Sequence, residues 1–183
     1  NRGVEFDQYP SELIGAVVVH KTTSASLIGQ GLSGTVDLQT VRPLAFGERV
    51  VSVNVRGEHN SLGSLNPGMT AYGSRISASY IDQFMDGRLG VALGFARLDS
   101  PGQSNRWESW GYPTGTIDGQ DGVFLPGGTK SIASSTENVR NGYMAVVEFK
   151  PNDNWSSVLD LYYSSFEREE TSRFIEVGLG WGG

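Results

Sequence analysis

The chain has 183 residues, of which 38% are hydrophobic and 25 are glycine; it has no cysteine and a formal net charge of −6. The lack of cysteine excludes disulfides, zinc–thiolate sites and cysteine nucleophiles. The acidic balance argues against nucleic acid as a partner, because phosphate binding needs a basic face. No apolar run reaches the 18 residues of a transmembrane helix, whereas a transmembrane β-strand needs only about 9–11 residues with one apolar face.

The first 45 residues have the pattern of a small globular segment punctuated by glycine. Pro10, Ser11 and Glu12 predict the start of a helix through Leu13 and Ile14, which Gly15 would end. The further elements expected here are a buried strand at 16–20, a helical turn at 24–28 and a strand at 35–40, stopped by Arg42 and Pro43.

After Pro43, apolar and polar residues alternate with a period of two, which predicts β-strands. We expect five full strands and part of a sixth, at residues 51–55, 72–80, 89–96, 143–149, 155–163 and 175–181. The polar face carries the charged residues Arg56, Arg75, Glu148, Asp160 and Glu176 among many small residues. Aromatic residues gather near the strand ends, at Tyr72, Tyr80, Phe149, Trp155, Tyr163 and Trp181. Such a pattern is typical of a bacterial outer-membrane barrel with aromatic girdles.

The connections between the expected strands alternate in length. Residues 85–88 and 151–154 form tight turns, whereas 59–68, 100–138 and 167–173 are longer links. Outer-membrane barrels combine short periplasmic turns with longer extracellular loops, so the connections favour a barrel over a β-sandwich, which the alternation alone also allows. Six strands are too few to close a barrel, and both chain ends look like cuts, so we expect an internal part of a longer protein.

A series of spaced residues near the N-terminus agrees in order with one known family: Tyr9-Pro10-Ser11-Glu12-Leu13-Ile14, Val17, Val19, Lys21-Thr22, Ala25, Gly29, Gly31, Gly34-Thr35-Val36-Asp37-Leu38, Thr40 and Arg42-Pro43. This run resembles the C-terminal half of the plug domain of TonB-dependent outer-membrane receptors. Residues 1–8 are similar to the proteobacterial branch often associated with carbohydrate uptake. His20 and Ser33 depart from the pattern, standing where Tyr and a second Gly are common. The plug motif proper consists of Pro10, Glu12, Lys21, Gly31, Gly34, Thr35, Arg42 and Pro43.

The resemblance implies an all-β membrane protein, a 22-stranded antiparallel barrel closed by a plug. Residues 1–45 would form the second half of the plug, a small α+β unit, and residues 46–183 the first five to six strands with their extracellular loops. Small residues at Gly90, Ala92, Gly94 and Ala96 would either make room for the plug or ease the curvature of the sheet.

The resemblance also implies a function without enzymatic activity or a cofactor. The protein would lie in the outer membrane of a Gram-negative bacterium, in contact with lipid, and would import an extracellular solute with force from TonB. The TonB-contacting element would lie upstream of Asn1. We prefer an oligosaccharide as the solute because residues 1–8 resemble the branch associated with carbohydrate uptake and because of the aromatic residues discussed next. An iron chelate of the siderophore type is the alternative. A barrel channel or enzyme is less well supported, because no Ser/His constellation stands out.

The stretch 100–138 contains the candidate substrate-binding residues Trp107, Trp110, Tyr112, Asp118 and Asp121. Aromatic faces beside carboxylates suit sugar rings, which have an apolar face and a rim of hydroxyls. The simpler interpretation is that the rings pack the loop onto itself, since a loop of this length needs its own core. The Asp-Gly pattern at 118–122 lacks the ligand spacing of an EF-hand, so a turn is expected there and no metal site.

Overall fold

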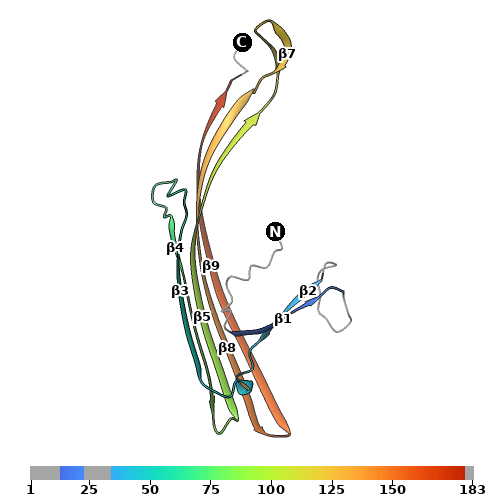
Figure 1. Ribbon diagram of the computed structural model, residues 1–183, viewed down its shortest axis with the longest axis vertical. Coiled ribbons are helices and arrows are strands. Elements are labelled where there is room, and N and C mark those ends of the chain that lie inside the picture. Colours follow the sequence, from blue (N-terminus) through green and yellow to red (C-terminus); the bar gives the residue numbers. More distant parts are fainter. Residues whose placement is uncertain (1–12, 23–33, 180–183) are drawn as a thin grey trace. The chain divides into compact units, whose positions relative to one another are not determined.

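The computed structural model describes residues 13–22 and 34–179, and this part of the chain is all-β, with no α-helix (Figure 1). It contains β1 (Ile14–His20), β2 (Thr35–Thr40), the 3-10 helix η3 (Pro43–Ala45), β3 (Val50–His59), β4 (Tyr72–Phe84), β5 (Leu89–Trp110), β6 (Thr114–Ile117), β7 (Gln120–Phe124), β8 (Gly128–Asn152) and β9 (Trp155–Gly178). None of the described segments is a helix long and apolar enough to cross a bilayer.

Five strands form a meander in the order β3-β4-β5-β8-β9, in which neighbours in the sheet follow one another in the chain. The hairpin β6–β7 is inserted between β5 and β8 and forms its own sheet. The tight turn expected at residues 85–88 joins β4 to β5, with positive φ angles at Met85, Asp86 and Gly87. A second short turn joins β8 to β9, as expected. Short connections of this kind make consecutive strands antiparallel.

Three strands are much longer than the hydrophobic alternation predicted. β5 continues to Trp110 and β8 begins at Gly128, so most of the expected loop at 100–138 is strand. The link expected at 167–173 is also wrong, because β9 runs through it and unites the fifth and sixth predicted strands. Residues in these extensions are mostly polar on both faces, so no regular apolar period marks them, yet their backbone groups still pair across the sheet.

The N-terminal segment differs from its prediction at the first element. Leu13 is in a 3-10 helical conformation, and Ile14 and Gly15 belong to β1, so the expected helix ends before Ile14 and not at Gly15. β1 pairs antiparallel with β2, with Ile14 opposite Thr40, and this pairing outweighs the local helical preference. The strand expected at 16–20 is confirmed but is not buried, since Val17 and Val19 are more than half exposed. β2 has the expected bounds. Residues 10–12 and the helical turn expected at 24–28 lie outside the described residues.

The chain groups into two compact units, which are described separately here. The first unit comprises residues 1–56, 74–98 and 139–166, and the second comprises residues 57–73, 99–138 and 167–183.

The core of the first unit joins the N-terminal segment to one face of the sheet. Leu13 and Val41 are buried together with Ile81 of β4, Ala92 of β5 and Val146 of β8. The backbone N–H of Val41 donates to the carbonyl of Leu13 at 2.9 Å, which holds the two segment residues together. Burial of these apolar side chains against the sheet is the main hydrophobic contribution in this unit.

Polar contacts reinforce this packing. The N–H of Leu44 donates to Glu148 of β8 at 2.8 Å, and the side-chain amide of Gln83 donates to the carbonyl of Pro43 at 2.8 Å. Arg42 forms an ion pair with Asp160 of β9 at 3.2 Å. The Thr40 hydroxyl donates to the same carboxylate at 2.5 Å. The segment is therefore attached to β4, β8 and β9.

Gly90 is small because the chain passes directly over it. A Cβ added at Gly90 would lie 2.9 Å from both the backbone nitrogen and a side-chain carbon of Leu44. Ala92, two residues further on, lies in the buried core. These contacts favour the interpretation in which small residues make room for a packed segment over one in which they only ease curvature.

A buried carboxylate at the turn end of β4 has two side-chain partners. Asp82 accepts hydrogen bonds from Arg49 at 2.7 Å and from the Tyr80 hydroxyl at 2.6 Å. The pKa of Arg49, which precedes β3, is raised, chiefly because its guanidinium donates to Asp82. The hydrogen bonds from Arg49 and Tyr80 compensate the negative charge of Asp82, which would be costly to bury without a partner.

Replacing Gly90 with Ala is expected to destabilise the first unit by about 1–3 kcal/mol, because the added methyl overpacks the contact with Leu44. Hydrogen exchange of the amides at 41–45 should accelerate. Gly57→Ala is the matched control, since an added Cβ there meets nothing within 4 Å. Equal exchange in the two variants would contradict the packing role of Gly90.

Candidate functional site

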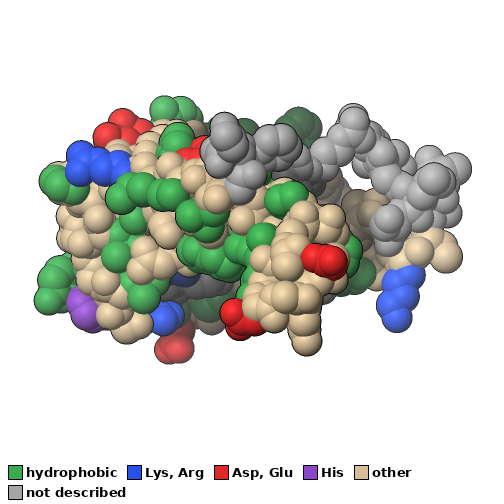
Figure 2. All heavy atoms as spheres, turned by 90° about the horizontal axis from the view of Figure 1, so that it is seen from above, with side chains coloured by type: hydrophobic (Ala, Val, Ile, Leu, Met, Phe, Trp, Pro, Cys, Tyr) green, Lys and Arg blue, Asp and Glu red, His purple; other side chains and the backbone are tan. Residues whose placement is uncertain are grey.

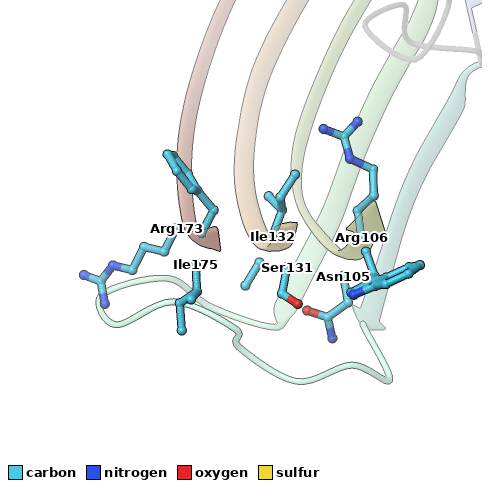
Figure 3. Close-up of a pocket in the computed structure, with 9 residues that line it drawn as sticks. Asn105, Arg106, Ser131, Ile132, Arg173 and Ile175 are labelled. Atoms are coloured by element: carbon cyan, nitrogen blue, oxygen red, sulfur yellow. The ribbon is translucent and has the colours of Figure 1, made fainter. Parts of the chain in front are cut away.

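A groove of about 640 Å³ lies across β5, β8 and β9 in the second unit (Figure 3). Its lining residues are Asn105, Arg106, Trp107, Ser131, Ile132, Ala133, Arg173, Phe174 and Ile175. Strand alternation divides them between the two sides of the sheet: Figure 3 shows Asn105, Ser131 and Ile175 on one side and Arg106 and Ile132 on the other. The side with Ser131 is the one with small residues at its centre.

The floor of the groove is formed by small residues of the central strand. The contact of Gln103 with Ser135, and that of Ser134 with Ser172, fix how the three strands align. Counting along the antiparallel strands from these contacts places Ser131 between Trp107 and Ile175. The same count places Ala133 between Asn105 and Arg173. Large side chains on the outer strands thus flank small ones on β8.

The charged groups around the groove differ in their pairing. Arg106 forms an ion pair with Glu108 at 2.8 Å. Lys130 lies 4.0 Å from the centroid of the Phe174 ring and 3.8 Å from Glu176. Within the described ranges, no carboxylate pairs with Arg173, which is exposed. Figure 3 shows the Arg173 side chain extending away from Ser131 and Asn105.

Of the five predicted substrate-binding residues, Trp107 alone lines the groove, and its side chain is 64% exposed. Trp110 packs instead against Gly128, where an added methyl would overlap the indole. Tyr112 is exposed outside the groove, and its hydroxyl contacts that of Ser109. For Trp110 the packing interpretation of the aromatic residues is therefore the better one.

Asp118 and Asp121 belong to the β6–β7 hairpin and do not join the groove. Asp118 and Gly119 have φ angles of +49° and +78° and form a two-residue turn between the paired residues Ile117 and Gln120. Asp121 accepts a hydrogen bond from Thr116. The expected Asp-Gly turn is confirmed. The part of the chain that the structure describes contains no cluster of three His, Asp or Glu residues suited to a metal ion.

The connection between β3 and β4 covers one end of the groove, which sequence reasoning missed. The buried amide of Asn66 donates to the carbonyl of Ala133 at 3.1 Å, to the Ser135 hydroxyl at 3.0 Å and to the carbonyl of Thr171 at 3.1 Å. Gln103 accepts from the N–H of Leu65 and donates to the carbonyl of Thr70. The Asn-Pro-Gly turn at 66–68 signals a turn, but nothing in it indicates a distant partner.

The plug-motif residues that the structure describes belong to the first unit and do not line the groove. Gly34 has a φ of +121°, and an added Cβ would lie 2.7 Å from the carbonyl oxygen of His20. Thr35 pairs with His20, and Lys21 is exposed. Arg42 binds Asp160, and Pro43 is buried at the start of η3. Pro10, Glu12 and Gly31 lie outside the described residues.

Comparisons of the chain with protein-family models, with curated proteins and with solved structures found no significant match.

Replacing Asn66 with Ala is expected to destabilise the second unit by about 1–3 kcal/mol, because buried acceptors at Ala133, Ser135 and Thr171 lose their donor. Limited proteolysis should then cleave within residues 60–71 faster than in the parent protein. Asn54→Ala, at an exposed position in β3, provides the control. Unchanged cleavage would show that the network does not hold this connection.

Proposed function

We propose that the chain is part of a TonB-dependent outer-membrane β-barrel that imports a solute, with residues 1–45 in the plug and the five-stranded sheet in the barrel wall. The observation that carries the proposal is that the sheet of the first unit has two chemically different faces. One face is covered by the N-terminal segment, and the other leaves large apolar side chains exposed.

The covered face has the properties expected of a wall that holds a plug. Its contacts with the segment combine a small apolar core with charged and hydrogen-bonded groups, such as Arg42 with Asp160 and Leu44 with Glu148. A lumen-facing surface of an outer-membrane barrel is polar and lined by small residues in this way. The contact also agrees with the plug resemblance of residues 9–43.

The open face carries large apolar side chains that are each more than one third exposed: Val51, Val53, Val55, Ile76, Leu93, Tyr143, Phe149, Trp155, Leu159, Leu161 and Tyr163. Seen from above, Figure 2 shows hydrophobic side chains among uncharged polar ones and several charged groups. Contiguous apolar patches of this extent mark an interaction surface, and lipid is the partner that accepts apolar groups without polar complementarity.

The length of this apolar face fits a bilayer. On β9 it extends from Trp155 to Tyr163, nine residues or about 30 Å of strand at ~3.3 Å per residue. At a tilt of ~45° this gives a height of about 21 Å, close to the ~25 Å apolar band of outer-membrane barrels.

A row of rings bounds the apolar face at one end. The rings of Phe95, Tyr143 and Tyr163, on three neighbouring strands, lie 5.1 Å and 6.1 Å apart between successive centroids. Two residues further along each strand, the face becomes polar: Arg97 donates to Asn141 at 3.1 Å, and Asn141 donates to Ser165 at 3.3 Å. A ring girdle followed at once by polar groups is the pattern of a membrane–water interface.

We further propose an oligosaccharide as the solute, TonB as the partner through a region upstream of this chain, and no enzymatic activity. The sugar preference rests on the resemblance of residues 1–8. The short turns that join β4 to β5 and β8 to β9 would face the periplasm, because outer-membrane barrels have their short connections on that side.

A charge on the open face should prevent assembly in the membrane. Leu161→Arg is expected to cost about 1–3 kcal/mol, because Leu161 lies between the bilayer midplane and the ring girdle at Tyr163. Ser156→Arg, which alternation places on the face of Asp160, should be tolerated. The readout is the fraction of protein recovered from outer membranes in a heat-modifiable, folded form. Equal recovery of the two variants would contradict lipid contact at Leu161.

Import is tested directly by uptake. Cells lacking the gene should lose energy-dependent uptake of labelled oligosaccharides, and dissipating the proton gradient should abolish uptake in the parent strain. A panel of ferric siderophores is assayed in parallel. Loss of siderophore uptake alone would replace the sugar with an iron chelate, and no loss of either would contradict the transport proposal.

A further inference from the structure

We propose that residues around Phe174 bind an uncharged oligosaccharide, on the face of β5, β8 and β9 that the N-terminal segment covers in the first unit. The inference rests on the proposed import of a sugar, and it specifies where the sugar binds and which class of sugar it is. The carrying observation is an exposed phenylalanine ring beside two ion pairs in which every charge has a partner.

The alignment of the strands groups these side chains into rows. Ring contacts and side-chain hydrogen bonds between β5, β8 and β9 all fit one antiparallel alignment. Counting along the strands from these contacts gives two neighbouring rows: Arg106, Ile132 and Phe174, then Glu108, Lys130 and Glu176. The ion pair of Lys130 with Glu176 at 3.8 Å agrees with this count.

Both rows lie on the face that carries the N-terminal segment. Ala92, Val146 and Asp160, which pack against or pair with that segment, are separated from the first row by an even number of residues on each strand. Phe174 therefore shares the face of Asp160, whereas Ile175 shares the opposite face with Tyr163. With the short turns toward the periplasm, as proposed, the two rows lie on the extracellular side of the segment, where an arriving solute meets them first.

The apolar part of the site is the ring of Phe174 with its neighbour on β8. Lys130 Nζ lies 4.0 Å from the ring centroid, yet Phe174 remains 58% exposed. Figure 3 shows the side chain of the neighbouring Ile132 on the same side of the sheet as Arg106. A flat aromatic surface beside an aliphatic side chain suits the C–H face of a pyranose ring.

The charges around the ring are balanced in pairs. Arg106 pairs with Glu108 at 2.8 Å, and Lys130 pairs with Glu176 at 3.8 Å. All four side chains are partly exposed, so their remaining N–H groups and carboxylate oxygens can bond to sugar hydroxyls. A charged ligand would have to displace one of these partners, whereas an uncharged sugar can bond to both members of a pair. The site therefore favours a neutral sugar over a uronate, a sulfated sugar or an anionic iron chelate.

A row of hydroxyls continues the polar surface along the strands. The next row toward the N-terminal segment consists of Ser104, Ser134 and Ser172, and the hydroxyls of Ser134 and Ser172 lie 2.7 Å apart. Each hydroxyl can both donate and accept, as sugar hydroxyls do. The site is thus longer than one sugar ring and suits a chain of rings.

The class of sugar is tested by calorimetry on the full-length protein in detergent micelles. The probes are neutral hexasaccharides of glucose, xylose, mannose and galactose, each with a counterpart of the same length in which one ring is a uronate. At least one neutral probe should bind about tenfold tighter than its acidic counterpart, the effect of one uncompensated charge. Absence of binding by every neutral probe, or equal binding within every pair, would overturn the assignment.

The role of the ring is tested by substitution. Phe174→Ala should weaken binding of the neutral probe by about tenfold, and Phe174→Tyr should retain it. Trp107→Ala is the matched control, because Trp107 is an exposed ring of the same groove that alternation places on the opposite face. Folding of each variant is verified by its heat-modifiable mobility. A loss with Trp107→Ala but not with Phe174→Ala would show that the sugar binds elsewhere.

The role of charge balance is tested by releasing one cation. Glu108→Gln keeps the size of the side chain but leaves Arg106 without its counter-charge, so the acidic counterpart should gain about tenfold in affinity while the neutral probe is unchanged. Asp153→Asn, which releases Lys150 at the turn between β8 and β9, should change neither affinity. An unchanged preference in Glu108→Gln would contradict selection by charge.

The face is tested by labelling with a maleimide, since the 183 residues contain no cysteine. Ser172→Cys lies on the face of Phe174, and Ile175→Cys lies on the opposite face. Saturating neutral sugar should slow labelling of the first thiol and leave the second unchanged. Protection of the Ile175→Cys thiol instead would overturn the assignment. A Ser172→Cys thiol that is unreactive without sugar would show that another segment of the protein covers this face, and would also overturn it.

Failure of this site and failure of import give different results. A protein that takes up neutral oligosaccharides but binds them independently of Phe174 keeps the proposed function and loses this site. Binding that depends on Phe174 in a protein without energy-dependent uptake would contradict the transport proposal alone.

Discussion

Backbone pairing along β5, β8 and β9 is the constraint on which the rest of the chain depends. These strands have 22, 25 and 24 residues, and the contacts of Phe95 with Tyr143 and of Trp110 with Gly128 fit one unbroken alignment of β5 on β8. Side chains add little interior: few apolar residues of the described part are buried. A sheet held together mainly by backbone hydrogen bonds between its strands can contact a different partner on each face.

The division of the faces follows from residue size. Where Leu44 crosses the sheet, the residue beneath it is Gly90, which has no side chain. The neighbouring core position on β5 is the small residue Ala92. Where nothing covers the sheet, valine, leucine and aromatic residues occur instead. The same rule recurs in the groove, where Ser131 and Ala133 on the central strand are flanked by larger side chains on β5 and β9.

The sequence predicts the strands that have one apolar face, because a period of two is visible only when one face avoids water. It could not predict the parts of β5, β8 and β9 that extend beyond the expected strands, where serine, threonine, asparagine and charged residues are frequent on both faces. It predicted β1 only from residue 16 onward and missed Ile14 and Gly15, because their place in the strand depends on pairing with β2, about 20 positions away. Among the site residues, Trp107 was found from local composition. Arg173 and Ile175 were missed because they reach the groove from β9, some 65 residues further along the chain.

The two edges of the sheet carry different chemistry. β9 bears Glu167, Arg168, Glu169 and Glu170 in succession, whereas β3 presents Val51, Val53 and Val55 without a charge between them. Consecutive charges on an edge strand oppose pairing with a foreign strand, a common protection against aggregation. Within the described sheet, the charges of β9 thus oppose mispairing with a foreign strand. The valine edge of β3 is the one that needs a chaperone or an early partner strand before the sheet is complete.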